Sequence, residues 1–248
     1  MNEIRFYISE HLEFVVITQG ILRFDEHCHT KNLVISAILS GTAKLTLNKK
    51  ERTLSKGEVF SLLPYENHSI KSSSPVDMVS MCISKELLSV DEDRLSALFT
   101  SAVNGLWSEE KLACDDIKQL LISTALTVCS AARDMVCEQD ELLTCDRSRL
   151  ETVPETEEDI ESLAENSYMS KYHYIRRFKS IAGLTPNRFR VQNRIRKAQQ
   201  MLRNGKDLTE TALDMGFYDQ SHFNKYFKRI VGIAPGDYIR SLRNFLQE

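Results

Sequence analysis

The stretch FKRIVGIAP at Phe227–Pro235 repeats, almost letter for letter, the stretch FKSIAGLTP at Phe178–Pro186, which begins 49 residues earlier. At this constant offset, Tyr174, Phe178, Ile181, Gly183 and Pro186 match Phe223, Phe227, Ile230, Gly232 and Pro235. The first three positions of each set are spaced i, i+4 and i+7, which places them on one face of a helix. The glycine can end this helix in a left-handed conformation, and the proline suits the first turn of the next helix. The repeat therefore predicts two copies of one helical unit.

Each copy follows a short helical segment that contains a small residue, Ala164 in the first copy and Ala212 in the second. A tight connection comes next, through Asn166-Ser167 or through Met215-Gly216. A short helix, a tight turn and a second helix with one apolar face form a helix-turn-helix motif. The sequence thus predicts two such motifs, joined by a long helix from Pro186 to Leu202.

The second helix of each unit leaves polar and cationic side chains outside its apolar face. These residues are Ser170, Lys171, Tyr172, Ile175, Arg176 and Lys179 in the first copy, and Gln220, Ser221, Asn224, Lys225 and Lys228 in the second. Arg and Lys can read guanine edges, Gln and Asn can read adenine edges, and apolar groups can contact the thymine methyl. Lys and Ser near the helix ends suit phosphate contacts. The alternative is an ordinary solvated face of a helical bundle.

Charge is distributed unevenly along the chain of 248 residues. Residues 1–154 hold 16 Lys/Arg against 23 Asp/Glu, a net charge of −7, whereas residues 167–248 hold 16 against 6, a net charge of +10. A basic C-terminal part attached to an acidic N-terminal part favours a polyanionic partner at the C-terminal end.

The segments RIRKAQQML (194–202) and DMGFYDQSHFNKYFKRIVGIAPGDY (214–238) resemble the DNA-binding domain of AraC/XylS transcription regulators, and the resemblance extends over residues 156–244. It implies seven helices and two recognition helices that enter successive segments of the major groove. It further implies base contacts by Tyr172, Ile175 and Arg176, and by Gln220, Ser221, Asn224 and Lys225. The phosphate contacts would fall on Ser170, Lys171, Lys179 and Lys228. Ile175 stands where relatives often have a polar residue, so it would contact a thymine methyl or mainly anchor the helix.

The first ninety residues predict short β-strands, because alternating runs are broken at Ser40-Gly41, Asn48-Lys49-Lys50 and Lys56-Gly57. Such strands form a sandwich or a small barrel. An amphipathic helix is predicted over residues 115–136, and the polar segment around Pro154 reads as a linker. We therefore expect an α+β chain with a sensor and dimerisation domain at 1–145, a linker at 146–155 and an all-α DNA-binding domain at 156–248.

The β-rich part resembles the cupin-type sensor domain of many AraC-family members, on HCHTKN (27–32) and GEVFSLLPYENHSI (57–70). In enzymatic cupins, two histidines one residue apart, a following Glu and a later His bind a metal. Thr30, Lys31, Asn32 and Leu33 stand where the carboxylate is expected, so we predict no metal, no cofactor and no enzyme activity. Four polar residues are instead expected near the barrel mouth around a small-molecule effector: His27, His29, Tyr65 and His68. The alternatives are histidines without a ligand role, or a metal-dependent cupin enzyme.

The resemblance implies a cytoplasmic regulator, more often an activator, that binds promoter DNA and contacts RNA polymerase. Its effector would be a sugar, another small metabolite or a fatty acid. The 115–136 helix suits homodimerisation, and the alternative is internal packing on the barrel. The segment MNEIRFYISEHLEF does not resemble a signal peptide, and no stretch is apolar enough to suggest a membrane partner, so we expect the chain to stay in the cytoplasm. A third reading is a helical module that binds another protein rather than DNA.

Overall fold

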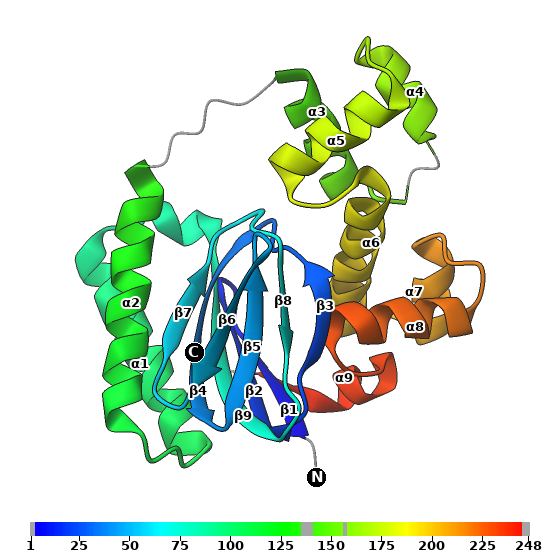
Figure 1. Cartoon of the computed structure of the whole chain (residues 1–248). Coiled ribbons are helices and arrows are strands. Elements are labelled where there is room, and N and C mark those ends of the chain that lie inside the picture. The colour runs from blue at the N-terminus through cyan, green and yellow to red at the C-terminus, as the bar shows by residue number, and fades with distance from the viewer. Residues whose placement is uncertain (1–2, 135–140, 156–157, 245–248) are drawn as a thin grey trace.

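The computed structural model describes residues 3–134, 141–155 and 158–244, and it joins a β-rich N-terminal part to a helical C-terminal part (Figure 1). The expected α+β class, with a cupin-like β domain followed by a helical domain, is confirmed. The last two residues of the helix predicted at 115–136 and the first two of the domain predicted from 156 lie outside the described residues. No helix in the described part of the chain is long and apolar enough to span a membrane.

Two sheets face each other in the N-terminal part. One has the strand order β10-β1-β2-β9-β4-β7 and the other β3-β8-β5-β6. The strands are β1 (Glu3–Ile8), β2 (Leu12–Gly20), β3 (Arg23–His27), β4 (Asn32–Ser40), β5 (Thr42–Leu47), β6 (Lys50–Ser55), β7 (Val59–Leu62), β8 (His68–Lys71), β9 (Val76–Ser84) and β10 (Leu242–Asn244). Side chains that alternate along the strands fill the space between the sheets, including Val34, Phe60 and Ile70. This is the barrel-like core that the alternating pattern predicted.

Helices α1 (Glu92–Glu109) and α2 (Asp115–Asp134) cover the outer face of the larger sheet, after a short 3-10 turn at Lys85–Ser89. Strand β4 is consequently buried on both faces from Leu33 to Leu39. The apolar stripe of α2, with Leu121, Ala125 and Cys129, packs into this layer. The stripe thus stabilises the β domain within one chain. This packing agrees with the alternative given for the 115–136 helix, internal packing on the barrel rather than homodimerisation.

The helical part contains α3 (Glu141–Thr152), α4 (Ile160–Asn166), α5 (Lys171–Ala182), α6 (Pro186–Arg203), α7 (Leu208–Asp214), α8 (Gln220–Val231) and α9 (Pro235–Ser241). Residues 146–152 of the expected linker form the second half of α3, which corrects the prediction of a continuous linker from 146 to 155. Leu143 and Leu150 are buried in the core formed by α4, α5 and the start of α6. The described part of residues 156–244 contains six helices, α4 to α9, whereas the resemblance implies seven; α3 packs with them but precedes that stretch.

The two predicted helix-turn-helix units are α4–α5 and α7–α8. Phe178 and Phe227 are fully buried in the two cores, and Gly183 and Gly232 end the second helices with φ of 75° and 94°. Proline begins the following helix in both copies. Each copy therefore builds the predicted arrangement from its repeated residues.

The turn inside each unit is where the copies differ. Tyr168 adopts a φ of 53° in the first turn, whereas Gly216 adopts a φ of 69° in the second. A residue with a Cβ is strained in this left-handed conformation, and glycine is not. The first turn thus carries a strain that the second avoids.

Several contacts attach the helical part to the β domain. β10 pairs with β1 in parallel, and Phe6 of β1 lies in the core of the second unit, 4.9 Å from Tyr238 between ring centroids. The first unit contacts the barrel through Cys28, whose thiol donates to the Ala182 carbonyl oxygen of α5 at 3.5 Å. Both units therefore contact the β domain.

Candidate DNA interface and interdomain cavity

Helix α5 presents two of its three expected base-contacting residues to solvent. Tyr172 is 89% exposed and Arg176 is exposed as well. Ile175 is half-buried and packs against the core of the first unit, so only part of its side chain faces outward. This placement favours the anchoring role for Ile175 over a full base contact.

The expected phosphate contacts of α5 are partly engaged within the protein. The Ser170 hydroxyl caps the helix by accepting the His173 N–H at 3.4 Å, and Lys171 Nζ lies 3.2 Å from Glu161 Oε2. Lys179 is half-buried near the end of the helix. A surface ion pair of this kind contributes little to stability, so Lys171 can exchange Glu161 for a phosphate at low cost.

Helix α8 offers a more open set of polar groups. Gln220, Ser221, Lys225 and Lys228 are exposed, while Asn224 is half-buried. The Asn224 Oδ1 atom has no hydrogen-bond partner among the described residues. Because that oxygen atom is itself buried, the exposed Gln220 amide and the exposed Lys225 are the groups of α8 that best suit base-edge recognition, since amide and cationic groups bond to adenine and guanine edges.

Two exposed tyrosines beside the recognition helices were not identified from the sequence. Tyr168 is 94% exposed in the first turn and Tyr218 is 91% exposed just before α8. Their exposure depends on the turn conformation, so periodicity could not reveal it. Large apolar groups exposed on a basic face are typical of a binding surface.

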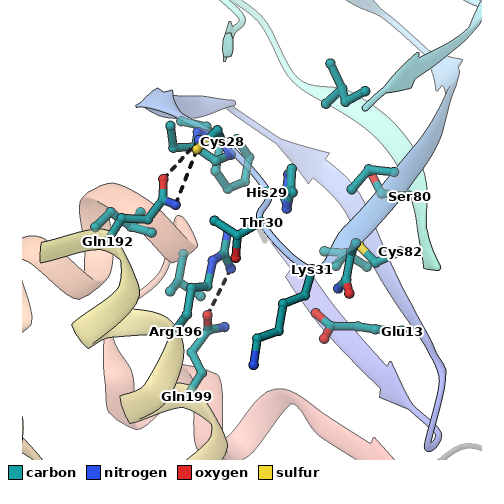
Figure 2. Close-up of a pocket in the computed structure, with 18 of the residues that line it drawn as sticks. Glu13, Cys28, His29, Thr30, Lys31, Ser80, Cys82, Gln192, Arg196 and Gln199 are labelled. Atoms are coloured by element: carbon teal, nitrogen blue, oxygen red, sulfur yellow. Dashed lines mark hydrogen bonds between the residues drawn. The ribbon is translucent and has the colours of Figure 1, made fainter. Parts of the chain in front are cut away.

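A cavity of about 370 Å³ lies between the two sheets and α6. Figure 2 shows Arg196 and Gln199 extending from α6 toward Thr30, with Lys31, Glu13 and Cys82 on the strand side. The inner wall between the sheets is mostly apolar, and it also carries Ser36 and Ser80, whose hydroxyls hydrogen-bond to each other at 2.8 Å. It includes Val34, Leu45, Phe60, Leu62, Ile70 and Met78. The cavity thus combines an apolar interior with a polar side formed by the helical domain, which is the composition of a small-molecule site.

Three of the four residues expected around an effector line this cavity. His27 and His68 are cross-strand partners at the end of β3 and β8, and His29 follows two residues after His27. Burial, followed by neighbouring charge, lowers the pKa of His27 and His29 well below the ordinary value, and burial lowers the pKa of His68 to about 4. The three imidazoles are therefore neutral at neutral pH.

Tyr65, the fourth of these residues, lies outside the cavity. Its backbone takes a φ of 66°, and its ring lies between Lys85 Nζ, 4.6 Å from the ring centroid, and Arg147 Cζ at 4.2 Å. Its hydroxyl donates to Glu151 Oε2 at 3.1 Å. Tyr65 therefore attaches the barrel to α3 through cation–π contacts rather than facing an effector.

The α6 side of the cavity was not predicted from the sequence. Arg196 donates to Gln199 Oε1 at 2.9 Å, and burial lowers the pKa of its guanidinium. The nearby carboxylate of Glu13 pairs instead with Arg203. Among the described residues, no carboxylate lies within ion-pair distance of Arg196. Arg196 is half-buried and lines the cavity, and a partly desolvated guanidinium without a counter-ion favours an anionic ligand because an unpaired charge is costly to remove from water.

Comparison with known proteins supports the assignment of both the β-rich N-terminal part and the helical C-terminal part. Residues 12–105 match the family model described as an AraC-like ligand binding domain, and residues 163–241 match a helix-turn-helix domain. The transcriptional regulator MtrA of Neisseria gonorrhoeae is 38% identical over 86 residues, which are 34% of this chain and 29% of MtrA. The uncharacterized regulator YbfI of Bacillus subtilis is 26% identical over 230 residues, 82% of this chain and 83% of YbfI.

The transcriptional activator RhaS of Escherichia coli is 33% identical over 88 residues, 35% of this chain and 32% of RhaS. The chain thus spans about a third of the length of the first curated relatives it matches, between 28% and 40%. Among solved structures, unsaturated fatty acid-bound ToxT of Vibrio cholerae has a TM-score of 0.55 at 14% identity, with 100% of both chains covered. At this identity the likeness shows the fold alone.

Proposed function

We propose that the chain, which matches an AraC-like ligand binding domain over residues 12–105 and a helix-turn-helix domain over residues 163–241, is an AraC-type regulator that binds promoter DNA sequence-specifically and controls transcription in response to a small molecule. The observation that carries the proposal is the pair of exposed recognition helices, each with cationic or amide side chains, on a domain joined to a barrel with an internal cavity. The named relatives are transcriptional regulators rather than enzymes, which supports a regulator without catalytic activity.

In this proposal the first unit reads DNA through Tyr172 and Arg176, and the second through Gln220, Ser221, Asn224 and Lys225. Lys228 and Lys171 contact phosphates, and Ile175 anchors α5. Because E. coli RhaS is named a transcriptional activator, we favour activation through contact with RNA polymerase. We further propose that the chain forms a homodimer and that it acts in the cytoplasm, where the chromosome lies. Its interface would use the face of α2 that remains open, where Leu120 is 44% exposed.

The effector proposed for the interdomain cavity is an amphiphile with an anionic head. Arg196 and the exposed Lys31 supply positive charge at the helical side, and the interior wall between the sheets is mostly apolar. A fatty acid fits this distribution of charge better than a sugar, because a sugar presents hydroxyl groups along its whole length. The fatty acid bound to ToxT, a protein of the same fold, supports the same class.

Helix α6 provides the link between the cavity and DNA binding. One face of α6 lines the cavity with Arg196 and Gln199. The helix begins directly after the first unit and ends directly before the second, so it joins the two units. An effector that contacts Arg196 therefore acts on the element that sets the spacing of the two recognition helices. A ligand shifts such an equilibrium only by its difference in affinity between the two arrangements.

The experiment that tests this proposal compares two variants of the full chain. Lys225→Ala should weaken binding to a genomic target site and leave the affinity for an unsaturated fatty acid such as oleate unchanged. Arg196→Gln should lower the oleate affinity at least about tenfold, because it removes the charged partner of a buried carboxylate, and should retain DNA binding. Fluorescence anisotropy and calorimetry measure the two affinities. The DNA-binding proposal would be contradicted if the unmodified chain showed no salt-sensitive DNA binding, or if Lys225→Ala bound the target site as tightly as the unmodified chain.

A further inference from the structure

The repeated glycines that end the two recognition helices, Gly183 and Gly232, both lie against the β domain. A methyl group added at Gly183 would lie 2.4 Å from the Tyr65 carbonyl oxygen, and one added at Gly232 would lie 2.6 Å from the Phe24 ring. Both separations are far shorter than an ordinary contact between heavy atoms, which for carbons is about 3.5–4.0 Å. The β domain therefore approaches the ends of α5 and α8 so closely that only a glycine leaves enough room.

Hydrogen bonds surround the first of these contacts. The Cys28 thiol donates to the carbonyl oxygen of Ala182, the last residue of α5, at 3.5 Å. The Cys28 backbone N–H donates to Gln192 Oε1 of α6 at 2.9 Å, and both residues are buried. The Tyr65 N–H donates to the His29 carbonyl oxygen at 2.7 Å, so the loop that meets the glycine is fixed to the segment that follows β3.

An ion pair and apolar residues accompany the second contact, where α8 lies beside β3 (Figure 1). Arg229 Nε of α8 lies 2.9 Å from Oδ2 of Asp25, which follows Phe24 on β3. Ile230 and Val231, the two residues before the glycine, line the interdomain cavity. An ion pair at the surface contributes little to stability, so the close fit at the glycine determines the docking more than charge does.

These contacts come from two neighbouring segments of the β domain, residues 23–29 and residues 63–67, which we call the docking platform. Glu26 of the first segment pairs with Arg188 at the start of α6, and the Asn67 amide of the second donates to the same carboxylate. The docking platform thus contacts the end of each recognition helix and the start of the helix that joins them.

We propose that the docking platform positions α5 and α8 relative to each other, and so sets the separation of the two DNA elements that the chain reads. Phe24 and Tyr65 are then positioning residues, because they act on DNA only through the helices that they hold. The inference rests on the proposed DNA-binding function, since both recognition helices must contact one site. Phe24 and His27 also line the cavity, so the surface that holds both helices borders the site proposed for the small molecule.

The test measures how DNA affinity depends on the separation of the two elements, with the full chain and a site that this chain selects from random-sequence DNA. One inserted base pair rotates the second element by about 35° and moves it by about 3.4 Å, and helices held by the docking platform cannot follow it. The insertion should lower the affinity of the unmodified chain at least about tenfold, and that of Gly183→Ala less than about threefold.

Gly205→Ala is the matched control, because its φ of 80° is close to the 75° of Gly183. A methyl group added at Gly205 meets no atom of the described residues within 4 Å, apart from its chain neighbours. This variant therefore carries the same backbone strain without the overlap, and it should show the same loss on insertion as the unmodified chain.

Gly232→Ala is the second variant, and circular dichroism shows which of the variants are folded. It should tolerate the inserted base pair as Gly183→Ala does. Adding Phe24→Leu to Gly232→Ala should restore most of the loss on insertion, because the smaller side chain makes room for the methyl group. Backbone strain alone would not be rescued in this way.

Hydrogen exchange at the Cys28 amide measures the docking without DNA, because this N–H donates to Gln192 across the interface. Its exchange should be at least about tenfold faster in Gly183→Ala than in Gly205→Ala. Equal losses on insertion in these two variants would overturn the inference, whether or not the exchange differs. If the unmodified chain bound its selected site no more tightly than random DNA, the proposed function would fail instead, and the exchange would still report the docking.

Discussion

The first helix-turn-helix unit, α4–α5, and the second, α7–α8, bury equivalent aromatic residues against different neighbours. Phe178 packs with Phe189 and with the α3 side chains Leu143 and Leu150. Phe227 packs with Tyr238 of α9, in a core that also contains Phe6 of the barrel. The repeated residues therefore determine the fold of each unit, and the residues around them determine how that unit is attached to the sensor domain.

The exposed surfaces differ more than the cores. Helix α5 offers an aromatic residue, an arginine and the half-buried Ile175, whereas α8 offers Gln220, Ser221 and Lys225 with little competition from internal contacts. If both units read DNA, the second should contribute more hydrogen-bonded base contacts. The comparison can be tested at the core, at the recognition face, at the helix cap and at the turn.

The largest effect is expected in the cores. Phe227→Ala should lower the free energy of unfolding by about 3–5 kcal/mol, because it removes a fully buried aromatic ring and leaves a cavity. Phe178→Ala should cost a similar amount if the two cores are equivalent. Chemical denaturation followed by circular dichroism measures both, with Leu213→Ala, at a side chain 62% exposed, as the control. An unchanged unfolding midpoint in Phe227→Ala would refute its core role.

The next effect is at the recognition face. Lys225→Ala should weaken specific DNA binding by about 1–3 kcal/mol and relax the preference at particular base pairs. Arg176→Ala should do the same at the other half of the site, while Ile175→Ala should have a smaller effect because that side chain is half-buried. Competition assays against specific and random DNA give both values. If the affinities for specific and random DNA fell equally, these residues would be phosphate contacts rather than base readers.

Helix capping gives a smaller difference between the units. Asp219 Oδ1 accepts the His222 N–H at 2.7 Å, whereas Ser170 Oγ accepts the His173 N–H at the longer distance of 3.4 Å. Asp219→Ala should therefore cost about 1 kcal/mol of stability, and Ser170→Ala less. Thermal unfolding of the two variants measures the difference. A larger loss in Ser170→Ala would show that the first cap is the stronger one and reverse this part of the comparison.

The smallest effect is expected in the turn. Tyr168→Gly should stabilise the protein by about 0.5 kcal/mol, because relief of the left-handed strain exceeds the entropic cost of glycine. Its ring is 94% exposed, so little packing is lost. Tyr218→Gly is the matched control, since Tyr218 is equally exposed without a positive φ, and it should destabilise slightly. A lower melting temperature in Tyr168→Gly than in Tyr218→Gly would mean that the tyrosine ring supports the turn.

The sequence allowed the helix-turn-helix units to be predicted because their apolar spacing, glycine and proline act locally. It did not reveal α3, where Leu143 and Leu150 are fully buried apolar residues in a largely polar segment and pack against residues distant in sequence. The cavity wall of α6 was missed for the same reason. Gln192 and Gln199 are only 2% and 3% exposed, but polar residues on a helix are ordinarily assigned to its solvated face.

In the barrel as well, the positions of some single side chains could not be predicted from the sequence. His27 and His29 lie together as expected, with ring centroids 5.4 Å apart, but His29 lies beyond the end of β3 rather than on the same strand, and the β3–β8 register adds His68. Tyr65 was grouped with them by its proximity in the sequence, yet its left-handed backbone directs the ring toward α3. Neither that φ nor the two cations near the ring, Lys85 and Arg147, can be inferred from neighbouring residues.

The most direct test of the central claim, that two distinct units read DNA together, is selection of binding sites from random-sequence DNA by the full chain. We predict an enriched sequence with two elements whose centres lie about 10–10.5 base pairs apart, one helical turn. Arg176→Ala should lose the preference at one element and Lys225→Ala at the other. Enrichment of a single element unaffected by one of these substitutions, or no enrichment over random DNA, would contradict the account.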